Sequence, residues 1–314
     1  MLDHYNDLSR VFVKKVGDFL KQGSGSLVKS GLKIPRSYKK EKEDMNLDKI
    51  GLIGMGNMGG AILRGLLKLY SPENMVFTDT SREKREAVTA ETGVPHTLTN
   101  RECAQQAKFL ILAVKPQYFE SVFEDIRPAV TPHQVIVSLA PGRSIANLTE
   151  GLGGNVRVVR VMPNTPALLG EGMTGVTYQP DAYTEEEKEE IKRIFTSCGR
   201  MELVEERLMD AVGCVSGCSP AYVYMFIEAL ADSGVKYGLP RQTAYTMAAQ
   251  TVLGSARMIL ETGKHPGQLK DEVCSPGGTT IAGVSALEES GFRSAVIKAG
   301  DACYKRTQEM KEMA

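Results

Sequence analysis

Short runs of β-branched and other apolar residues recur along the middle of the chain, and the segments between them repeat apolar residues at helical spacing. The runs predict strands at Lys49–Gly54, Met75–Asp79, Phe109–Val114, Val135–Ala140, Val156–Met162, Met173–Tyr178 and Met201–Val204. Helical patterns lie between most of them, for example at Ile62–Tyr70, Arg82–Thr92 and Thr184–Ser197. Apolar strands that alternate with helices are typical of a sheet covered on both faces. We therefore predict an α/β fold with a Rossmann-like, doubly wound sheet that is parallel in its first half.

The alternation stops after about residue 206, and no strand is predicted beyond it. Long helices are predicted there at 220–238, 241–262 and 292–312. The segment Pro220–Leu230 is apolar on nearly all faces, so a helix there must be buried on all sides. One small helical domain can hardly cover it, which predicts a subunit interface. We expect two domains, residues 45–206 and 207–314, the second one all-α.

Residues 1–44 differ from the rest of the chain. Residues 8–20 place apolar side chains on one helical face, and Gly23–Ser26 is typical of a flexible linker. This pattern fits either a docking or targeting helix, or an extension without a role of its own. Acidic Asp3, Asp7 and Asp18 argue against a transit peptide, and we expect a flexible extension.

Composition and charge narrow the choice of partners. The chain has 314 residues, and lysine plus arginine equals aspartate plus glutamate at 38 each. This balance gives no reason to expect a nucleic acid or a membrane surface as partner. The chain has no apolar run of about 18 residues, so no membrane-spanning helix is predicted. Residues 1–44 lack the apolar core of a secretory signal.

The six cysteines predict reduced thiols in a cytoplasmic protein, because a chain of this size needs no disulfides for stability. Cys214 and Cys218 are four residues apart, as in some zinc sites. No second pair of cysteines or histidines follows nearby at ligand spacing, so we predict no metal site.

A glycine motif, Gly54-Met55-Gly56-Asn57-Met58-Gly59, follows the first predicted strand and opens a helix. In this context it predicts a dinucleotide site. Gly54 allows a tight turn, Gly56 allows the backbone to approach a pyrophosphate, and Gly59 allows close packing of helix and strand. The free N–H groups at the helix start favour the phosphates.

The residues after the second predicted strand give two conflicting signals about the cofactor. Asp79 can accept hydrogen bonds from an adenosine ribose, which favours NADH. Thr80, Ser81 and Arg82 can instead hold a 2′-phosphate, which favours NADPH. The sequence leaves the choice between NADPH and NADH open.

Several further motifs resemble those of the pyrroline-5-carboxylate reductase family over about residues 47–312. They are Ala113-Val114-Lys115-Pro116, Met162-Pro163-Asn164-Thr165-Pro166, Ser216-Gly217-Cys218-Ser219-Pro220-Ala221-Tyr222, Ser275-Pro276-Gly277-Gly278-Thr279-Thr280-Ile281 and Leu287–Arg293. The stretch Ser275–Ile281 is the most specific of them. The family often has Ser-Gly-Ser-Gly-Pro-Ala-Tyr where this chain has Cys218 and Ser219 in place of serine and glycine.

The resemblance implies hydride transfer from NAD(P)H to the cyclic imine 1-pyrroline-5-carboxylate, giving L-proline. It implies a helical domain that forms a homodimer, with dimers that often assemble into rings. Cofactor contacts are implied for Gly54, Gly56, Asn57, Met58, Asp79, Thr80, Ser81, Asn100, Ala113, Val114, Lys115, Pro116, Leu139, Ala140 and Pro141. The implied substrate residues are Ser275, Gly277, Gly278, Thr279 and Thr280, with Glu206 near the same cleft.

The turn before Thr280 suits the chemistry of such a substrate. A helix is predicted to begin near Thr280, and its free N–H groups can bind a carboxylate. Thr280 can hydrogen-bond the imine nitrogen or hold the carboxylate, and we assign it the catalytic role. Lys115 is expected to position the cofactor. Alternatives are another two-domain reductase, of the β-hydroxyacid dehydrogenase or imine reductase type, and a nucleotide-binding regulator without catalysis.

Overall fold

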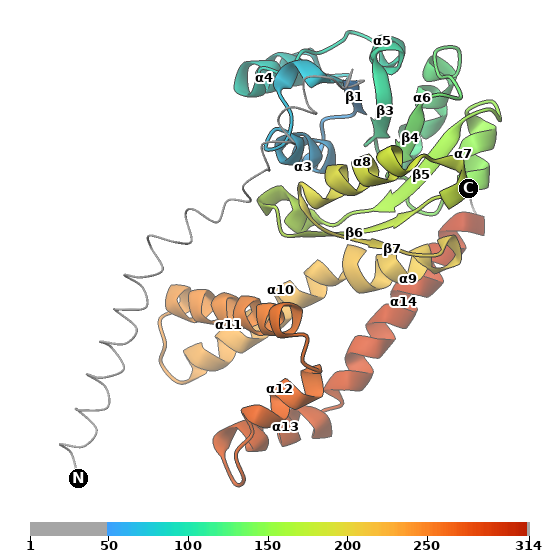
Figure 1. Cartoon of the computed structure of the whole chain (residues 1–314). Helices are drawn as coiled ribbons and strands as arrows, with labels where there is room; N and C mark the ends of the chain where they lie inside the picture. Colours follow the sequence, from blue (N-terminus) through green and yellow to red (C-terminus); the bar gives the residue numbers. More distant parts are fainter. Residues whose placement is uncertain (1–48, 313–314) are drawn as a thin grey trace. The chain divides into compact units, whose positions relative to one another are not determined.

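The centre of the structure is a seven-stranded sheet with strand order β2-β1-β3-β4-β5-β6-β7 (Figure 1). The computed structural model describes residues 49–312. The strands are β1 (Lys49–Ile53), β2 (Met75–Thr78), β3 (Ala107–Leu112), β4 (Val135–Ser138), β5 (Arg157–Met162), β6 (Gly172–Thr177) and β7 (Gly199–Leu203). β1 to β5 are parallel, β6 is antiparallel to β5, and β7 is parallel to β6. The predicted strands and the parallel first half of the sheet are confirmed.

Helices cover both faces of this sheet, because successive side chains of a strand point to opposite faces. In β3, Phe109 and Ile111 pack in one core with α3 and α8, whereas Leu110 and Leu112 pack in a second core with α5, α6 and α7. The helices of this part are α3 (Asn57–Leu66), α4 (Arg82–Thr92), α5 (Asn100–Gln106), α6 (Phe119–Ile126), α7 (Ile145–Gly151) and α8 (Glu185–Thr196). The sheet is therefore doubly wound, as predicted.

The strand order places a crevice at the ends of β1 and β3. The chain runs from β1 outward to β2 and then returns to β3 on the other side of β1. In open α/β sheets, ligands bind at such a reversal, outside the carboxyl ends of the strands. The glycine motif follows β1 directly and so lies at this point.

The first helix differs from its predicted bounds. It runs from Asn57 to Leu66, whereas the apolar spacing predicted a helix over Ile62–Tyr70. The helix begins early because the glycine loop leads directly into it. After Leu66 the backbone tightens into turns, with Lys68 N donating to the oxygen of Gly65. Apolar side chains continue past this end, so their periodicity did not reveal it.

The second part of the chain is helical. It consists of α9 (Met209–Val212), a π-helical turn (Gly213–Gly217), α10 (Ser219–Lys236), α11 (Arg241–Thr262), α12 (Pro266–Glu272), α13 (Thr279–Glu289) and α14 (Phe292–Glu312). α10 and α11 pack against each other through Ala231, Ala244 and Ala248. α14 contacts α9 and the π-helical turn. The predicted long helices are confirmed to within two residues.

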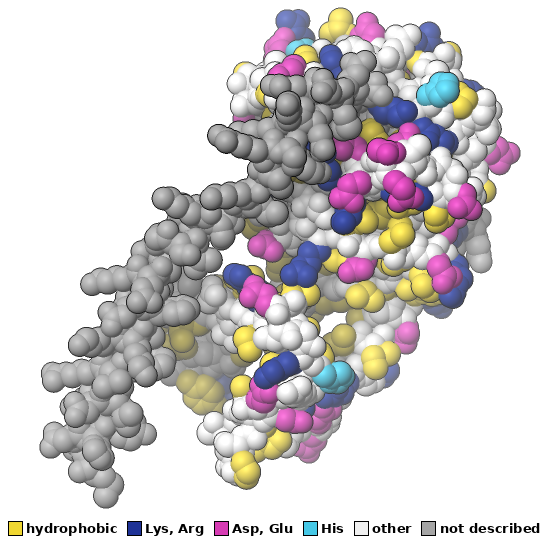
Figure 2. Space-filling view, in the orientation of Figure 1, with side chains coloured by type: hydrophobic (Ala, Val, Ile, Leu, Met, Phe, Trp, Pro, Cys, Tyr) yellow, Lys and Arg dark blue, Asp and Glu magenta, His cyan; other side chains and the backbone are white. Residues whose placement is uncertain are grey.

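The apolar helix α10 is largely uncovered in a single chain. Ala231 is its one buried residue, and Tyr224 and Met225 are 60% and 68% exposed. Figure 2 shows hydrophobic side chains on the surface of this helical part. By length and composition alone, the stretch Glu206–Lys236 is also apolar enough to cross a membrane, although the sequence predicted no such span. This exposed apolar surface is the one for which the sequence predicted a subunit interface.

Candidate active site

The glycine loop between β1 and α3 has the geometry of a phosphate-binding turn. Gly54 has a φ of +98°, which favours glycine. A Cβ at Gly59 would lie 2.0 Å from the oxygen of Gly54, so only glycine lets the helix pack this closely. A Cβ at Gly56 would meet no atom within 4 Å. Gly56 therefore borders open space at the start of α3, where a pyrophosphate fits.

A cavity of about 330 Å³ opens beside this loop, at the ends of β1 and β3. Its lining residues come from these strand ends, the end of β2 and the starts of α4, α5 and α6. They are Ile53, Gly54, Gly56, Asp79, Thr80, Lys84, Asn100, Ala113, Val114, Lys115, Tyr118, Ser121 and Val122. Eight of the predicted cofactor residues thus line one cavity. Its place at the reversal of strand order fits a dinucleotide.

Asp79 is held inside the protein by several donors. Its carboxylate accepts hydrogen bonds from Met55 N at 2.8 Å and Ser81 N at 3.0 Å, and Lys84 Nζ lies 3.2 Å away. Burial alone would raise the pKa of Asp79, but these three donors together lower it below its ordinary value. The carboxylate is therefore charged, and much of its accepting capacity is already used.

Lys84, rather than Arg82, is the cation beside this carboxylate. The side chain of Arg82 is 83% exposed, and its Nε pairs with Glu86 at 2.7 Å. Lys84 lines the cavity together with Asp79 and Thr80. The structure thus does not bring Arg82 to the cavity, and the sequence pattern gives no signal for Lys84.

The other predicted cofactor residues lie around the cavity without lining it. Asn57 borders a neighbouring hollow on the other side of Gly56. Leu139, Ala140 and Pro141 follow β4 at the same edge of the sheet, and Ala140 is buried. The cavity lining likewise does not include Met58, Gly59, Ser81 or Pro116.

Lys115 follows β3 at the cavity, and Pro116 begins the next turn. Its side chain is exposed, and among the described residues its ammonium has no hydrogen-bond or ion-pair partner. Since no acid or base lies against it, the structure gives Lys115 no catalytic partner within one chain. A role in positioning the cofactor stays a prediction.

The turn Ser275–Thr280 lies at the start of α13 and is exposed. Gly278 is the N-cap without a side-chain hydrogen bond, and its N donates to the oxygen of Ser275 at 3.0 Å. Gly277 has a φ of +68°. The N–H groups of the first helical turn have no partners within the helix. This end of α13, which begins one residue before Thr280, can therefore bind a carboxylate.

Comparison with known proteins gives consistent matches along the chain. The family model "pyrroline-5-carboxylate reductase dimerisation" matches residues 206–310, and "NADP oxidoreductase coenzyme F420-dependent" matches residues 49–142. The chain is 45% identical over 268 residues to pyrroline-5-carboxylate reductase of Escherichia coli K12, covering 84% of this chain and 98% of that protein. The Glycine max enzyme is 41% identical over 263 residues, covering 83% and 95%. The chain belongs to the pyrroline-5-carboxylate reductase family.

Solved structures of the family share the fold. A pyrroline-5-carboxylate reductase from Coxiella burnetii has a TM-score of 0.79 at 35% identity, covering 84% of this chain and 98% of that one. The Plasmodium falciparum enzyme, with NADP bound, has a TM-score of 0.75 at 34% identity, covering 85% and 99%. The predicted family, the fold class and an NAD(P)-dependent oxidoreductase are thereby confirmed, and homo-oligomerisation through the helical domain is supported.

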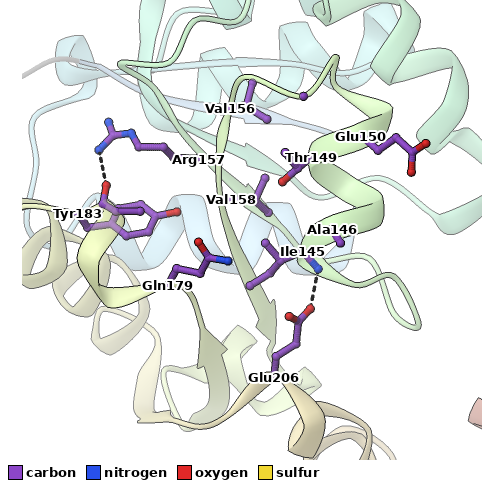
Figure 3. A pocket seen from close by; sticks show the side chains of 12 residues that line it. Ile145, Ala146, Thr149, Glu150, Val156, Arg157, Val158, Gln179, Tyr183 and Glu206 are labelled. Atoms are coloured by element: carbon purple, nitrogen blue, oxygen red, sulfur yellow. Dashed lines mark hydrogen bonds between the residues drawn. The ribbon is translucent and has the colours of Figure 1, made fainter.

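Within this family member, Glu206 lies apart from the Ser275–Thr280 turn. Its Oε1 accepts a hydrogen bond from Ile145 N at 2.6 Å, at the first turn of α7 (Figure 3). The cavity that it borders, of about 540 Å³, includes no residue of that turn. In one chain, Glu206 therefore caps α7, and its place near the substrate turn stays a prediction.

Asn164, in the motif after β5, has a structural role that the motif alone did not show. Its Nδ2 donates to the oxygen of Ser216 at 3.0 Å, and its Oδ1 accepts from Met173 N at 2.8 Å. These bonds join the end of β5, β6 and the π-helical turn. The motif thus connects the nucleotide part to the helical part.

Proposed function

We propose that this chain reduces 1-pyrroline-5-carboxylate to L-proline with NAD(P)H, the last step of proline biosynthesis. One observation carries the proposal: the chain matches reductases of this name along almost their full length and retains the Ser275–Thr280 turn at an exposed helix start. The domain division at residues 45–206 and 207–314 is part of the proposal. It is supported by a family match that begins at residue 206.

The substrate carboxylate binds at the start of α13 in this account. The N–H groups of Thr279, Thr280 and Ile281 precede the first complete helical turn, and the helix dipole favours an anion there. Gly277 and Gly278 carry no side chain to block the approach. The carboxylate is thereby fixed, and the ring of the substrate takes a defined direction from it.

The imine needs orientation more than a strong acid. When bound, the reduced nicotinamide supplies the hydride. Ser275, Thr279 and Thr280 offer hydroxyls but no acidic group. A cyclic imine can arrive already protonated, so a hydrogen bond from the imine N–H to Thr280 Oγ1 holds the carbon in place. Such positioning can contribute most of the rate.

The preferred cofactor in this proposal is NADPH. Lys84 lies at the end of the cavity formed by Asp79 and Thr80, where the adenosine ribose binds in such folds. Asp79 is already occupied by Met55 N and Ser81 N, which weakens it as a ribose acceptor. The 2′-phosphate of NADPH accepts a hydrogen bond from Lys84 Nζ, and its negative charge offsets the positive charge of Lys84. The NADP-bound relative agrees with this preference.

The working form in this proposal is a homodimer, with a ring of dimers as a further step. The Ser275–Thr280 turn lines none of the cavities described above, and the Gly54–Gly59 loop belongs to another part of the chain. A second copy that covers α10 buries its exposed apolar side chains and can bring the turn of one chain to the cavity of the other. We propose this cover in place of a membrane.

A cytoplasmic location completes the proposal. All six cysteines lie in the described part of the chain and are free thiols. Free thiols are the usual state in a reducing compartment. The location is tested by fractionation of cells that express the tagged chain.

The proposed reaction is tested by steady-state kinetics on the purified chain. NADPH oxidation should begin only when 1-pyrroline-5-carboxylate is added, and proline should appear in equal amount. A β-hydroxyacid or a simple cyclic imine without a carboxylate should react far more slowly. Equal rates with these compounds would favour another reductase. Nucleotide binding without turnover on any of them would favour a non-catalytic regulator.

A further inference from the structure

Two thiols that are far apart in the sequence meet between α10 and α14. Cys218 directly follows the π-helical turn that leads into α10, and Cys303 lies in the middle of α14. Their Sγ atoms are 3.3 Å apart. A disulfide needs about 2.05 Å, so a movement of about 1 Å joins them. Side-chain rotation can supply much of this movement.

A third thiol, Cys214, lies on the same π-helical turn. Burial and the neighbouring Cys303 raise the pKa of Cys214 to about 12. Its Sγ donates to the oxygen of Asp210 at 3.3 Å, which occupies the thiol. Cys214 is half-buried, whereas Cys218 is exposed. In one chain, Cys218 is therefore the thiol that a small solute reaches first.

The thiol pair lies where the helical part joins the sheet. Ser216, two residues before Cys218, accepts the hydrogen bond of Asn164 at the carboxyl end of β5. The end of α14, beyond Cys303, reaches Asp210 through Gln308. A covalent bond between the two thiols would hold α14 against this junction. The family motif often has serine at the position of Cys218, and a chain with serine there lacks this thiol pair.

We propose that Cys218 and Cys303 form a reversible disulfide when the protein meets a peroxide, and that this bond slows turnover. The Cys218 thiol loses its proton, and the thiolate attacks one oxygen of hydrogen peroxide. The O–O bond breaks, and the leaving hydroxide takes up a proton to give one water. The resulting sulfenic acid is attacked by the Cys303 sulfur, which loses its proton, and a second water leaves. Two thiols are oxidised and one peroxide is reduced. A dithiol reductant reverses the reaction.

The pace of this reaction follows from the surroundings of the thiols. Cys218 is exposed as a residue, but part of its surroundings is protein rather than water. This partial burial and the neighbouring Cys303 raise the pKa of Cys218, so little thiolate is present near neutral pH. The disulfide therefore forms during prolonged rather than brief exposure. Turnover slows because the bond restricts the junction between the two parts.

The test uses the full chain treated with hydrogen peroxide, after which free thiols are alkylated. Peptide mass spectrometry should find Cys218 linked to Cys303. Thermal unfolding should move to higher temperature, and turnover should fall severalfold in parallel with the disulfide. Dithiothreitol should restore both. The effect on turnover rests on the proposed reductase function, whereas the linked peptide and the unfolding shift do not.

Two variants and one control sharpen the test. Cys218→Ser, which carries the residue often found in the family, and Cys303→Ser should both retain turnover after peroxide. Cys274→Ser leaves the pair intact and should lose turnover as the unaltered chain does. A disulfide at Cys214 or between chains overturns the proposal. So does unchanged turnover once Cys218 and Cys303 are joined.

Discussion

At the scale of single residues, Lys84 is the side chain on which cofactor choice depends. It lines the cavity and lies 3.2 Å from Asp79. We expect Lys84→Met to raise the Michaelis constant for NADPH about five- to thirtyfold, because a partly exposed charged hydrogen bond is worth about 1–2 kcal/mol. The constant for NADH should change little, since it has no 2′-phosphate. Both constants are measured by steady-state kinetics.

Arg82→Met is the matched control, because it removes a neighbouring cation that points away from the cavity. It should leave both constants unchanged. If Arg82→Met weakens NADPH and Lys84→Met does not, the assignment of the two cations is reversed.

Thr280 is the residue with the most direct part in the proposed chemistry. Thr280→Ala removes an exposed hydroxyl and little volume, so the fold should survive. If the hydroxyl holds the imine in the transition state, the turnover number should fall roughly two- to tenfold. A rise in the Michaelis constant alone would mean that it only anchors the carboxylate. Unchanged kinetics would remove Thr280 from the site.

The sequence located the end of β2. It singled out Arg82 as the cation for the cofactor, whereas Lys84 is the cation that lines the cavity. Ser81 caps α4, with its side chain accepting from Lys84 N, so Arg82 and Lys84 are the first and third helical residues. At 3.6 residues per turn they point in nearly opposite directions. Arg82 was favoured because it directly follows Thr80 and Ser81 in the sequence. Which side chain reaches the cavity depends on where α4 begins, and the structure shows that start.

At the scale of elements, the end of α14 is fixed by a buried charge on α9. Asp210 accepts hydrogen bonds from Gln308 and Lys311 of α14, and its Oδ1 lies 3.4 Å from Arg160 Nη2 of β5. Burial alone would raise the pKa of Asp210, but Lys311, Gln308 and Arg160 lower it. The charged carboxylate therefore joins three elements that the sequence separates widely.

We expect Asp210→Asn to destabilise the protein at neutral pH by up to about 3 kcal/mol, because it removes the nearer of the two carboxylates beside buried Arg160 and leaves only Glu206, at 3.9 Å. A carboxyl group whose pKa is lower in the folded than in the unfolded protein stabilises the fold at pH values above its unfolded pKa. This stabilisation is lost as the pH falls through the folded pKa. The difference between variant and parent should thus shrink below about pH 4. Chemical denaturation at several pH values measures it.

Asp232→Asn is the control, since Asp232 pairs with Arg241 at the surface. An exposed pair contributes little, so this variant should lose less than about 1 kcal/mol. Equal losses for the two variants, or a difference that does not change with pH, would contradict the role given to Asp210.

The elements themselves were largely readable from the sequence. The apolar runs that became β1 to β7 are short and bounded by turn residues, so their pattern is distinct from that of helices. The end of α3 was not readable, because Leu67, Leu69 and Tyr70 continue the apolar pattern beyond it. The antiparallel pairing of β6 with β5 was not predicted either, since strand direction leaves no local signal.

At the scale of the whole molecule, the exposed apolar surface of α10 is the proposed contact with a second copy. Met225 is 68% exposed in one chain. If α10 forms the interface, Met225→Glu should weaken association about tenfold or more, because a buried charge without a partner is costly. Sedimentation over a concentration series measures the shift toward monomer, and activity should fall with it.

Lys192→Glu changes charge on α8, away from the helical part, and should leave association unchanged. A stable and active monomer of the unaltered chain at micromolar concentration would contradict the proposed assembly. Association of Met225→Glu equal to that of the parent would place the interface elsewhere.

The sequence predicted the need for this cover but not where one chain places the residues assigned to the substrate. All-round apolarity of residues 220–230 is visible in the sequence. The separation of Glu206 from the Ser275–Thr280 turn is not, because it depends on where α7 and α13 lie in the fold. Residues 1–44 lie outside the described residues, and their predicted flexibility stays a prediction.

The central claim, hydride transfer to the imine carbon of 1-pyrroline-5-carboxylate, is tested most directly with labelled cofactor. The chain is incubated with this substrate and NADPH that carries deuterium at the transferable position of the nicotinamide. The proline formed is then analysed by mass spectrometry and NMR. We predict one deuterium at the former imine carbon for each NADPH oxidised. Oxidation of NADPH without labelled proline, or no reaction by a folded, NADPH-binding oligomer, would contradict the account.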